Sequence, residues 1–210
     1  MKPRAWAWFF TVAVAATSVR AQGTFQNLDF EAARLVFLGP GSPLIATTNA
    51  LPGWTATFGT SQLSQVSYVG GIFGSVELLG LSGSAIDGSF SAVIGGDATA
   101  SASIRQTGLV PTDARSLQFK VKFSGAVPNE MEVWLGAESL ALVPLGAPRG
   151  YFLVGADISS FAGQTETLSF SGGLFALDDI EFSPQLVPEP SVLALAGAAA
   201  SLLLCRRKRS

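Results

Sequence analysis

Acidic side chains are the groups in this sequence with the clearest chemical potential. Glu130 and Glu132 precede Trp134 in an alternating segment, and Asp178 and Asp179 are adjacent. Two carboxylates suffice to hydrolyse a glycoside. However, a pair of acids two residues apart is common on any solvated strand, and adjacent strand residues point to opposite faces. We therefore expect no enzymatic activity, and we keep a glycoside hydrolase as an alternative.

The chain contains 210 residues, with no His and one Cys, Cys205. The absence of imidazole excludes a Ser-His-Asp triad, a Cys-His pair and a His-ligated metal. A single Cys also excludes an internal disulfide. We therefore expect the fold to depend on its hydrophobic core, and on any ion that it binds.

The first 21 residues have the pattern of a secretory signal. Lys2 and Arg4 are followed by an apolar run of 12 residues, Ala5–Ala16, and Val19 and Ala21 are the small residues of a cleavage site. The alternatives are a buried first helix or a membrane anchor, but such a run spans only about 18 Å of helix. The sequence therefore predicts a signal peptide, residues 1–21, with the export translocon and signal peptidase as partners.

The last residues, 185–210, form a second segment with three parts in fixed order. The motif of residues 187–191 is Val187, Pro188, Glu189, Pro190 and Ser191; a transmembrane segment, residues 192–205, and the basic cluster Arg206, Arg207, Lys208 and Arg209 follow. Two prolines prevent regular structure from running through the motif. The basic cluster should stay on the cytoplasmic side, which leaves the body outside.

This arrangement resembles the PEP-CTERM sorting signal of Gram-negative bacteria. The resemblance implies processing by exosortase, a membrane protease-transpeptidase, and an association with exopolysaccharide. It also implies an inner-membrane-anchored precursor that ends in the cell envelope or the extracellular matrix. The alternative is a permanent single-pass anchor with no processing.

Residues 22–184 form the expected body, which is acidic. Between the two terminal segments lie six Lys and Arg and 14 Asp and Glu, a net charge near −8. Nucleic-acid binding needs clustered Lys and Arg. We therefore expect no nucleic-acid partner.

The body is predicted to be all-β, as a jelly-roll β-sandwich. Apolar residues alternate with polar ones through 115–123 and 130–135, a period of two with one wet face. Further strands are expected at residues 28–31, 65–69, 75–79, 102–107, 150–154, 165–170 and 177–182. A helical turn is expected at Ile158–Ala162 and a long loop at Gly39–Ala50.

The body also resembles a galactose-binding-like jelly roll, the fold of many non-catalytic carbohydrate-binding modules. The resemblance is carried by four segments: Asn27–Glu31, Leu51–Trp54, Asp157–Gln164 and Leu177–Phe182. It implies a structural Ca²⁺ held by an N-terminal Glu and a C-terminal Asp, which by position are Glu31 and Asp179. Carboxylate oxygens are the ligands that Ca²⁺ prefers. The alternative is that these acids are solvated strand-edge residues or turn caps.

Trp134 and Glu132 are the candidate sugar contacts. If the alternation holds, they share a face, while Met131, Val133 and Leu135 point to the core. An indole ring stacks on a pyranose, and a carboxylate accepts hydrogen bonds from sugar hydroxyls. Alternatively, Trp134 packs under a loop or in a second core layer, as Trp54 is expected to pack in the core. Two functions stay open: polysaccharide binding, or a structural surface or matrix protein without a specific ligand.

Overall fold

The computed structural model describes residues 23–69, 75–80, 84–96, 100–123, 131–148 and 150–187. Its strands are β1 (Leu44–Ala46), β2 (Thr55–Phe58), β3 (Ser61–Gln62), β4 (Gln65–Tyr68), β5 (Val76–Gly80), β6 (Phe90–Ile94), β7 (Ala102–Leu109), β8 (Ser116–Phe123), β9 (Met131–Leu135), β10 (Glu138–Ser139), β11 (Val143–Gly146), β12 (Phe152–Asp157), β13 (Thr165–Gly172) and β14 (Phe175–Ser183). The described helices are a single turn each, α1 (Thr47–Ala50) and the 3₁₀ turn η2 (Ser159–Phe161). The all-β prediction is therefore confirmed for the described residues.

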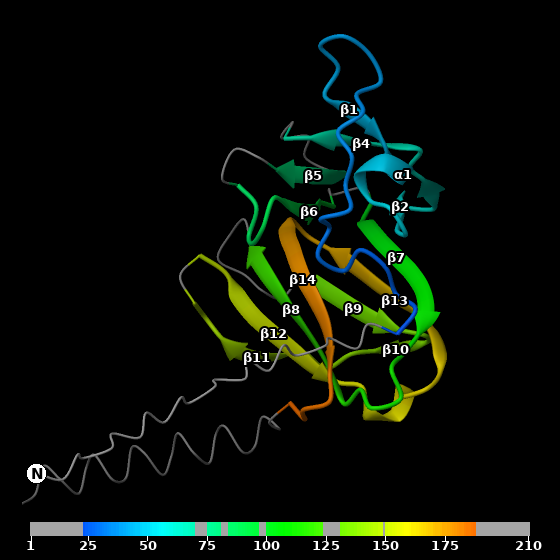
Figure 1. Ribbon diagram of the computed structural model, residues 1–210, viewed down its shortest axis with the longest axis vertical. Coiled ribbons are helices and arrows are strands. Elements are labelled where there is room, and N and C mark those ends of the chain that lie inside the picture. Colours follow the sequence, from blue (N-terminus) through cyan, green and yellow to red (C-terminus); the bar gives the residue numbers. More distant parts are fainter. Residues whose placement is uncertain are drawn as a thin grey trace, which may run out of the picture.

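The strands form two sheets (Figure 1). The eight-stranded sheet has the order β1-β4-β5-β6-β14-β8-β12-β11, and the six-stranded sheet has the order β10-β9-β13-β7-β2-β3. Neighbouring strands are antiparallel except for the parallel pair β4 and β5. From β6 to β9 and again from β12 to β14, each successive strand lies in the other sheet. This repeated crossing is typical of sandwiches of the jelly-roll type.

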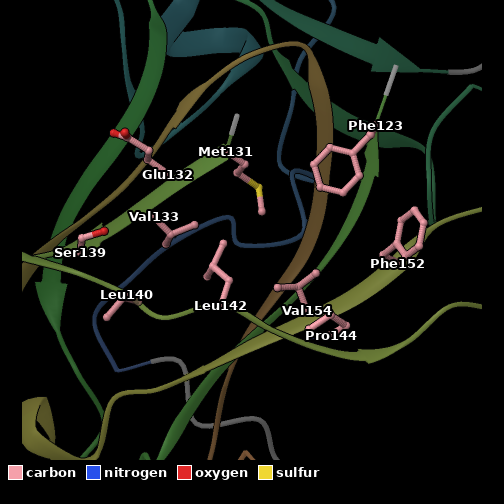
Figure 2. A pocket seen from close by; sticks show the side chains of 10 residues that line it. All are labelled: Phe123, Met131, Glu132, Val133, Ser139, Leu140, Leu142, Pro144, Phe152 and Val154. Atoms are coloured by element: carbon pink, nitrogen blue, oxygen red, sulfur yellow. The ribbon is translucent and has the colours of Figure 1, made fainter. Parts of the chain in front are cut away.

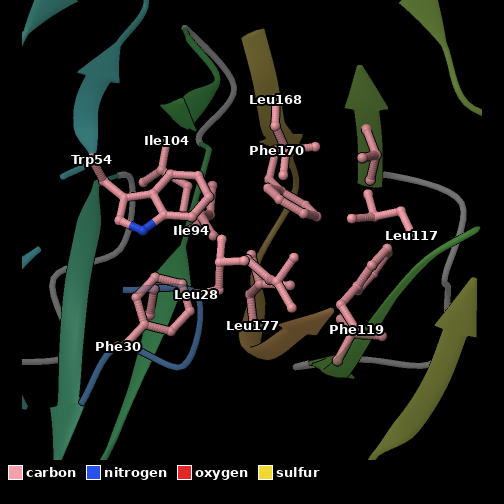
Figure 3. Close-up of a cluster of buried hydrophobic side chains, with 14 of the residues drawn as sticks. Leu28, Phe30, Trp54, Ile94, Ile104, Leu117, Phe119, Leu168, Phe170 and Leu177 are labelled. Atoms are coloured by element: carbon pink, nitrogen blue, oxygen red, sulfur yellow. The ribbon is translucent and has the colours of Figure 1, made fainter. Parts of the chain in front are cut away.

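The core lies between the two sheets, and period-two alternation supplies its side chains (Figure 3). On β8, Leu117, Phe119 and Val121 are fully buried. Phe119 meets Phe170 of β13 edge-on, with ring centroids 5.2 Å apart, so the aromatic contact joins the two sheets. Burying a side chain of this size stabilises the fold by about 1.5–3 kcal/mol.

Trp54 belongs to this core, as predicted, and is only 5% exposed. Its ring lies 5.9 Å from the Phe30 ring and 6.3 Å from the Phe170 ring. Its indole Nε1 donates a 3.0 Å hydrogen bond to the Asn27 carbonyl, so its one polar group is satisfied. Trp54 thus fastens the N-terminal segment of the body onto the sandwich.

Two sequence predictions about this part of the chain are wrong. Residues 28–31 form a turn, not a strand: Asn27 and Phe30 have positive φ angles of 50° and 59°, and the Asn27 side chain accepts from the Ala32 amide at 2.9 Å. Leu28 and Phe30 are buried on either side of exposed Asp29, so the turn imitates the alternation of a strand. The predicted loop Gly39–Ala50 contains β1 and α1.

The predicted signal peptide, residues 1–21, and the transmembrane segment, residues 192–205, lie outside the described residues. Both stay predictions. Within the part of the chain that is described, no helix has the length and apolar character needed to cross a bilayer.

Candidate functional site

The side of the six-stranded sheet that faces away from the core carries mainly small hydroxyl residues. We call it the outer face. Its members are Thr55 and Thr57 of β2, Ser103, Arg105 and Thr107 of β7, Glu132 and Trp134 of β9, and Thr167, Ser169 and Ser171 of β13. The residues between them on the same strands, such as Ile104 and Phe170, are buried in the core. The face is therefore a direct consequence of strand alternation.

Strand register arranges the outer face in rows that run across the sheet. In one row, Trp134 lies opposite Ser169, Ser169 opposite Arg105, and Arg105 opposite Thr55. Because neighbouring strands are about 4.8 Å apart, the backbones at Trp134 and Arg105 are separated by about 10 Å. Only the small Ser169 side chain stands between them in the row.

A second row lies beside the first, two residues along each strand. Glu132 is opposite Ser171, Ser171 opposite Ser103, and Ser103 opposite Thr57. The hydroxyls of Thr57 and Ser103 are 2.6 Å apart and hydrogen-bonded. Thr107 and Thr167, in the row on the other side of Arg105, form a similar pair at 2.7 Å. These two hydrogen bonds link β7 to its neighbours on both sides through side chains of the outer face.

Trp134 stands out from this floor as its one large aromatic side chain. It is 37% exposed, and its Nε1 lies 3.3 Å from Oε2 of Glu132, within hydrogen-bond distance. Met131, Val133 and Leu135 of the same strand are buried, so the predicted division of the two sides of β9 is confirmed. Trp134 is not part of a second core layer. Glu130, the other acid of this segment, lies outside the described residues.

An apolar pocket of about 500 Å³ opens beside β9, between the edges of the two sheets. It is lined by Phe123, Met131, Glu132, Val133, Ser139, Leu140, Leu142, Pro144, Phe152 and Val154. Figure 2 shows Phe123 and Phe152 on one side of the pocket and the two polar residues, Glu132 and Ser139, on the opposite side. Glu132 thus lies where the pocket meets the outer face.

The two predicted calcium ligands, Glu31 and Asp179, lie in a different part of the molecule. Glu31 lies beside the start of β6, and Asp179 lies at the irregularity in the middle of β14. Glu31 Oε1 accepts from the backbone amides of Ser89 and Phe90, at 2.7 Å and 2.9 Å. Asp179 Oδ2 lies 3.0 Å from Nζ of Lys120. Lys120 also forms an ion pair with Asp87, so its ammonium group bridges two carboxylates.

Asp178 is the buried centre of this corner, with 1% of its surface exposed. Its Oδ2 accepts from the Asp87 amide at 2.9 Å and the Ser91 hydroxyl at 2.7 Å, and its Oδ1 accepts from the Asp179 amide at 2.7 Å. Burial raises the pKa of Asp178 to about 6, although these hydrogen bonds oppose the shift. Burial alone would lower the pKa of Lys120, but its bonds to Asp87 and Asp179 raise it overall.

The fit of this corner to Ca²⁺ is poor. Ca²⁺ needs six to eight oxygen ligands. Here the ammonium of Lys120 already compensates Asp179 and Asp87, and Glu31 Oε1 is engaged by two backbone amides. Within the described ranges, no group of three or more His, Cys, Asp or Glu residues is placed to hold a metal. Calcium binding therefore stays a prediction from sequence.

The predicted sorting motif begins where the described body ends. Val187 is 8% exposed, and its Cγ2 lies 3.0 Å from the position that a Cβ on Gly155 of β12 would occupy. Pro188, Glu189, Pro190 and the basic cluster 206–209 lie outside the described residues. The role of this segment as a sorting signal and its processing therefore stay predictions.

Comparison with known proteins gives only distant likenesses. No family model matches the chain, and no curated protein matches it. One similar solved structure is the family 11 carbohydrate-binding module from Clostridium thermocellum, in complex with a β-1,3-1,4-mixed-linked tetrasaccharide (14% identity, TM-score 0.40, covering 70% of this chain and 97% of that one).

Another similar structure is the enzymatically active domain of tailspike protein 4 from bacteriophage CBA120 (16% identity, TM-score 0.37, covering 62% of this chain). The present chain spans 19% of that protein's length. At these levels of similarity, neither structure bears on the function of this chain.

Sequence reasoning missed two features that the structure brings forward, the position of Arg105 and the burial of Asp178. Arg105 is exposed at the middle of β7, and its isolation among hydroxyls is visible only once strand register is known. The burial of Asp178 does not follow from the sequence pattern, because β14 is irregular between Asp178 and Glu181, where Asp179 has a φ of 46°. A lone Arg in an alternating Ser/Thr strand was the one available signal for the first of them.

Proposed function

We propose that this protein is an exported, non-catalytic component of the cell envelope or extracellular matrix that binds polysaccharide through the outer face. The observation that carries the proposal is the exposed Trp134 beside Glu132 on a floor of small hydroxyl residues. A flat indole offers an apolar platform to the C–H face of a sugar ring. The Glu132 carboxylate accepts hydrogen bonds from the hydroxyls at the edge of that ring.

The small size of the neighbouring residues leaves room for a bound chain. Ser169 and Ser171 flank Trp134 and Glu132 on the adjacent strand, so the neighbouring side chains of β13 are too small to cover the platform. Hydroxyls offer both donors and acceptors to sugar hydroxyls without adding charge. A polysaccharide lying across the strands would contact several of these rows at once.

The non-catalytic part of the proposal is supported by the acids around the platform. Glycoside hydrolysis uses two carboxyl groups that flank the scissile bond. Among the described residues, the apolar pocket beside the outer face is lined by one carboxylate, Glu132. The Asp178 and Asp179 carboxylates belong to the hydrogen-bonded corner with Lys120 and Ser91, near β6.

The export part of the proposal rests on the sequence. The N-terminal signal and the motif Val187–Ser191 with its basic end, Arg206–Arg209, together indicate translocation followed by exosortase-type sorting. Exopolysaccharide of the producing cell is the natural ligand class for a protein with this destination. The signal peptidase, the translocon and an exosortase-like protease are the proposed processing partners.

A glycan array, together with a pull-down on the producing cell's own exopolysaccharide, tests the proposed function. The full chain should be retained, and Trp134→Ala should lose at least about tenfold in affinity because its stacking platform is gone. Phe37→Ala is the matched control, since Phe37 is also an exposed aromatic (44%) but lies outside the outer face. If no polysaccharide is retained, or if both variants behave like the parent, the proposal is wrong, and a structural protein without a specific ligand becomes the better account.

A further inference from the structure

Arg105 is the one cation among the described residues of the outer face, and it stands near the centre of that face. It lies on β7, which has β13 and β9 on one side and β2 and β3 on the other. Its cross-strand neighbours are Ser169 and Thr55. Ser103 and Thr107 are the outward residues before and after it on its own strand. Arg105 is therefore surrounded by short, uncharged hydroxyl side chains.

Arg105 also differs from Lys120, whose charge is compensated by two aspartates. Within the described part of the chain, no carboxylate lies within ion-pair distance of Arg105. The guanidinium presents N–H donors in a planar fork that matches a carboxylate. The body carries a net charge near −8, so the uncompensated Arg105 is a local positive site on an acidic protein, and it can attract an anionic group of a ligand.

The position of Arg105 relative to Trp134 fits one extended ligand. Both lie in the same cross-strand row, about 10 Å apart, with only Ser169 between them. Glu132, the acid of the face, lies on β9 beside Trp134, in the adjacent row. A bound polysaccharide therefore meets the acceptor Glu132 over β9 and the cation Arg105 over β7. This separation of charges orients an acidic sugar with its carboxylate toward Arg105.

From this juxtaposition we propose that the polysaccharide bound by the outer face is acidic, with a uronate carboxylate held by Arg105 while a neighbouring sugar ring stacks on Trp134. The inference rests on the proposed polysaccharide binding and narrows its ligand class. Charge-assisted, two-pronged hydrogen bonds to a carboxylate give specificity as well as affinity. Because the site is exposed, salt should weaken the binding.

Affinity electrophoresis of the full chain in polygalacturonate, and in the same polymer with its carboxyl groups reduced to alcohols, tests the inference. We expect the parent to bind polygalacturonate roughly tenfold more tightly than the reduced polymer. Arg105→Gln should abolish this preference, and Arg105→Lys should keep part of it because the charge stays but the fork is lost. Lys122→Gln removes an exposed cation from the eight-stranded sheet and should behave like the parent.

The outcomes separate the two proposals. Equal binding of both polymers, lost in Trp134→Ala but unchanged in Arg105→Gln, overturns the acidic-ligand inference and leaves polysaccharide binding standing. If the parent binds neither polymer, the acidic-ligand inference is also wrong. If the glycan array in addition retains no polysaccharide, the proposed function is wrong too. A circular dichroism spectrum like the parent's establishes that each exposed-site variant is folded.

Discussion

The indole Nε1 of Trp134 and Oε2 of Glu132 lie 3.3 Å apart on the solvent side of β9, two residues from each other along the strand. The contact holds the carboxylate at the edge of the aromatic platform. Glu132→Gln keeps the shape of the side chain but halves its acceptor capacity and removes its charge. We expect this change to weaken binding of a neutral polysaccharide about threefold to tenfold by isothermal titration calorimetry.

Glu138→Gln is the matched control for that measurement. Glu138 is also exposed and lies on the neighbouring strand β10, but its register partner is Leu135, whose side chain is buried. The control should bind like the parent. A loss of affinity as large in Glu138→Gln as in Glu132→Gln would show that overall charge, not the Glu132 contact, governs binding.

The buried Asp178 predicts an unusual pH dependence of stability. Its pKa is about 6 in the folded protein against an ordinary 3.8, so the folded state takes up this proton first as the pH falls. The contribution of Asp178 to the free energy of unfolding should therefore rise as the pH falls from 7.5 to 5, by on the order of 1 kcal/mol.

Urea unfolding of the parent and Asp178→Asn at pH 7.5 and at pH 5 measures this effect. Asn does not titrate, so the difference in stability between parent and variant should shift in favour of the parent at pH 5. The same difference at both pH values would mean that Asp178 titrates normally in the folded state.

The Lys120 ion pairs predict that the fold does not depend on calcium. We expect EDTA to leave the Tm of the parent unchanged. Lys120→Gln should lower the free energy of unfolding by about 1 kcal/mol or more, because Asp87 and Asp179 lose their shared cation. A fall in the parent's Tm on chelation, restored by added Ca²⁺, would instead support the calcium site predicted at Glu31 and Asp179.

Much of the sandwich could be predicted because alternating segments with one wet face have a single stable arrangement. Residues 116–123 and 131–135 alternate in the sequence and are strands in the structure, with the predicted side buried. Leu28 and Phe30 alternate equally well but belong to a turn with positive φ at Asn27 and Phe30, and this turn also buries both apolar side chains. Periodicity over four residues does not distinguish these cases.

The candidate site was only half predictable for a related reason. Trp134 and Glu132 are neighbours on one strand, so local alternation places them together. Arg105, Ser169 and Trp134 meet through cross-strand register, which depends on the tertiary fold and leaves no mark on local sequence. For the same reason Lys120 was not expected at the acidic corner, since it comes from β8 while its partners flank β6 and interrupt β14.

Phe170 links the two sheets through its contact with Phe119 of β8, and it also contacts Trp54, which precedes β2 of its own sheet. Phe170→Ala leaves a cavity between the two sheets, and we expect it to lower the free energy of unfolding by about 3–5 kcal/mol in a urea titration. Ser169→Ala, on the opposite side of the same strand, should change it by less than about 0.5 kcal/mol. Equal effects of the two changes would contradict the assignment of sides to β13.

Intact mass spectrometry of the protein recovered from outside the cell tests the two terminal signals together. We expect a mature chain that starts near Gln22 and ends near Val187, the last described residue, which is buried against the sandwich. A species that keeps the basic end, Arg206–Arg209, would mean a lasting anchor and no exosortase-type cleavage.

Fluorescence quenching by acrylamide tests polysaccharide binding at the outer face most directly, because Trp134 is exposed and Trp54 is buried in the core. Saturating exopolysaccharide should protect the parent's fluorescence from acrylamide, and this protection should be absent in Trp134→Phe, whose remaining tryptophans include the already shielded Trp54. Equal quenching of the parent with and without bound polysaccharide would contradict the account, because it would mean that the ligand does not cover the Trp134 ring.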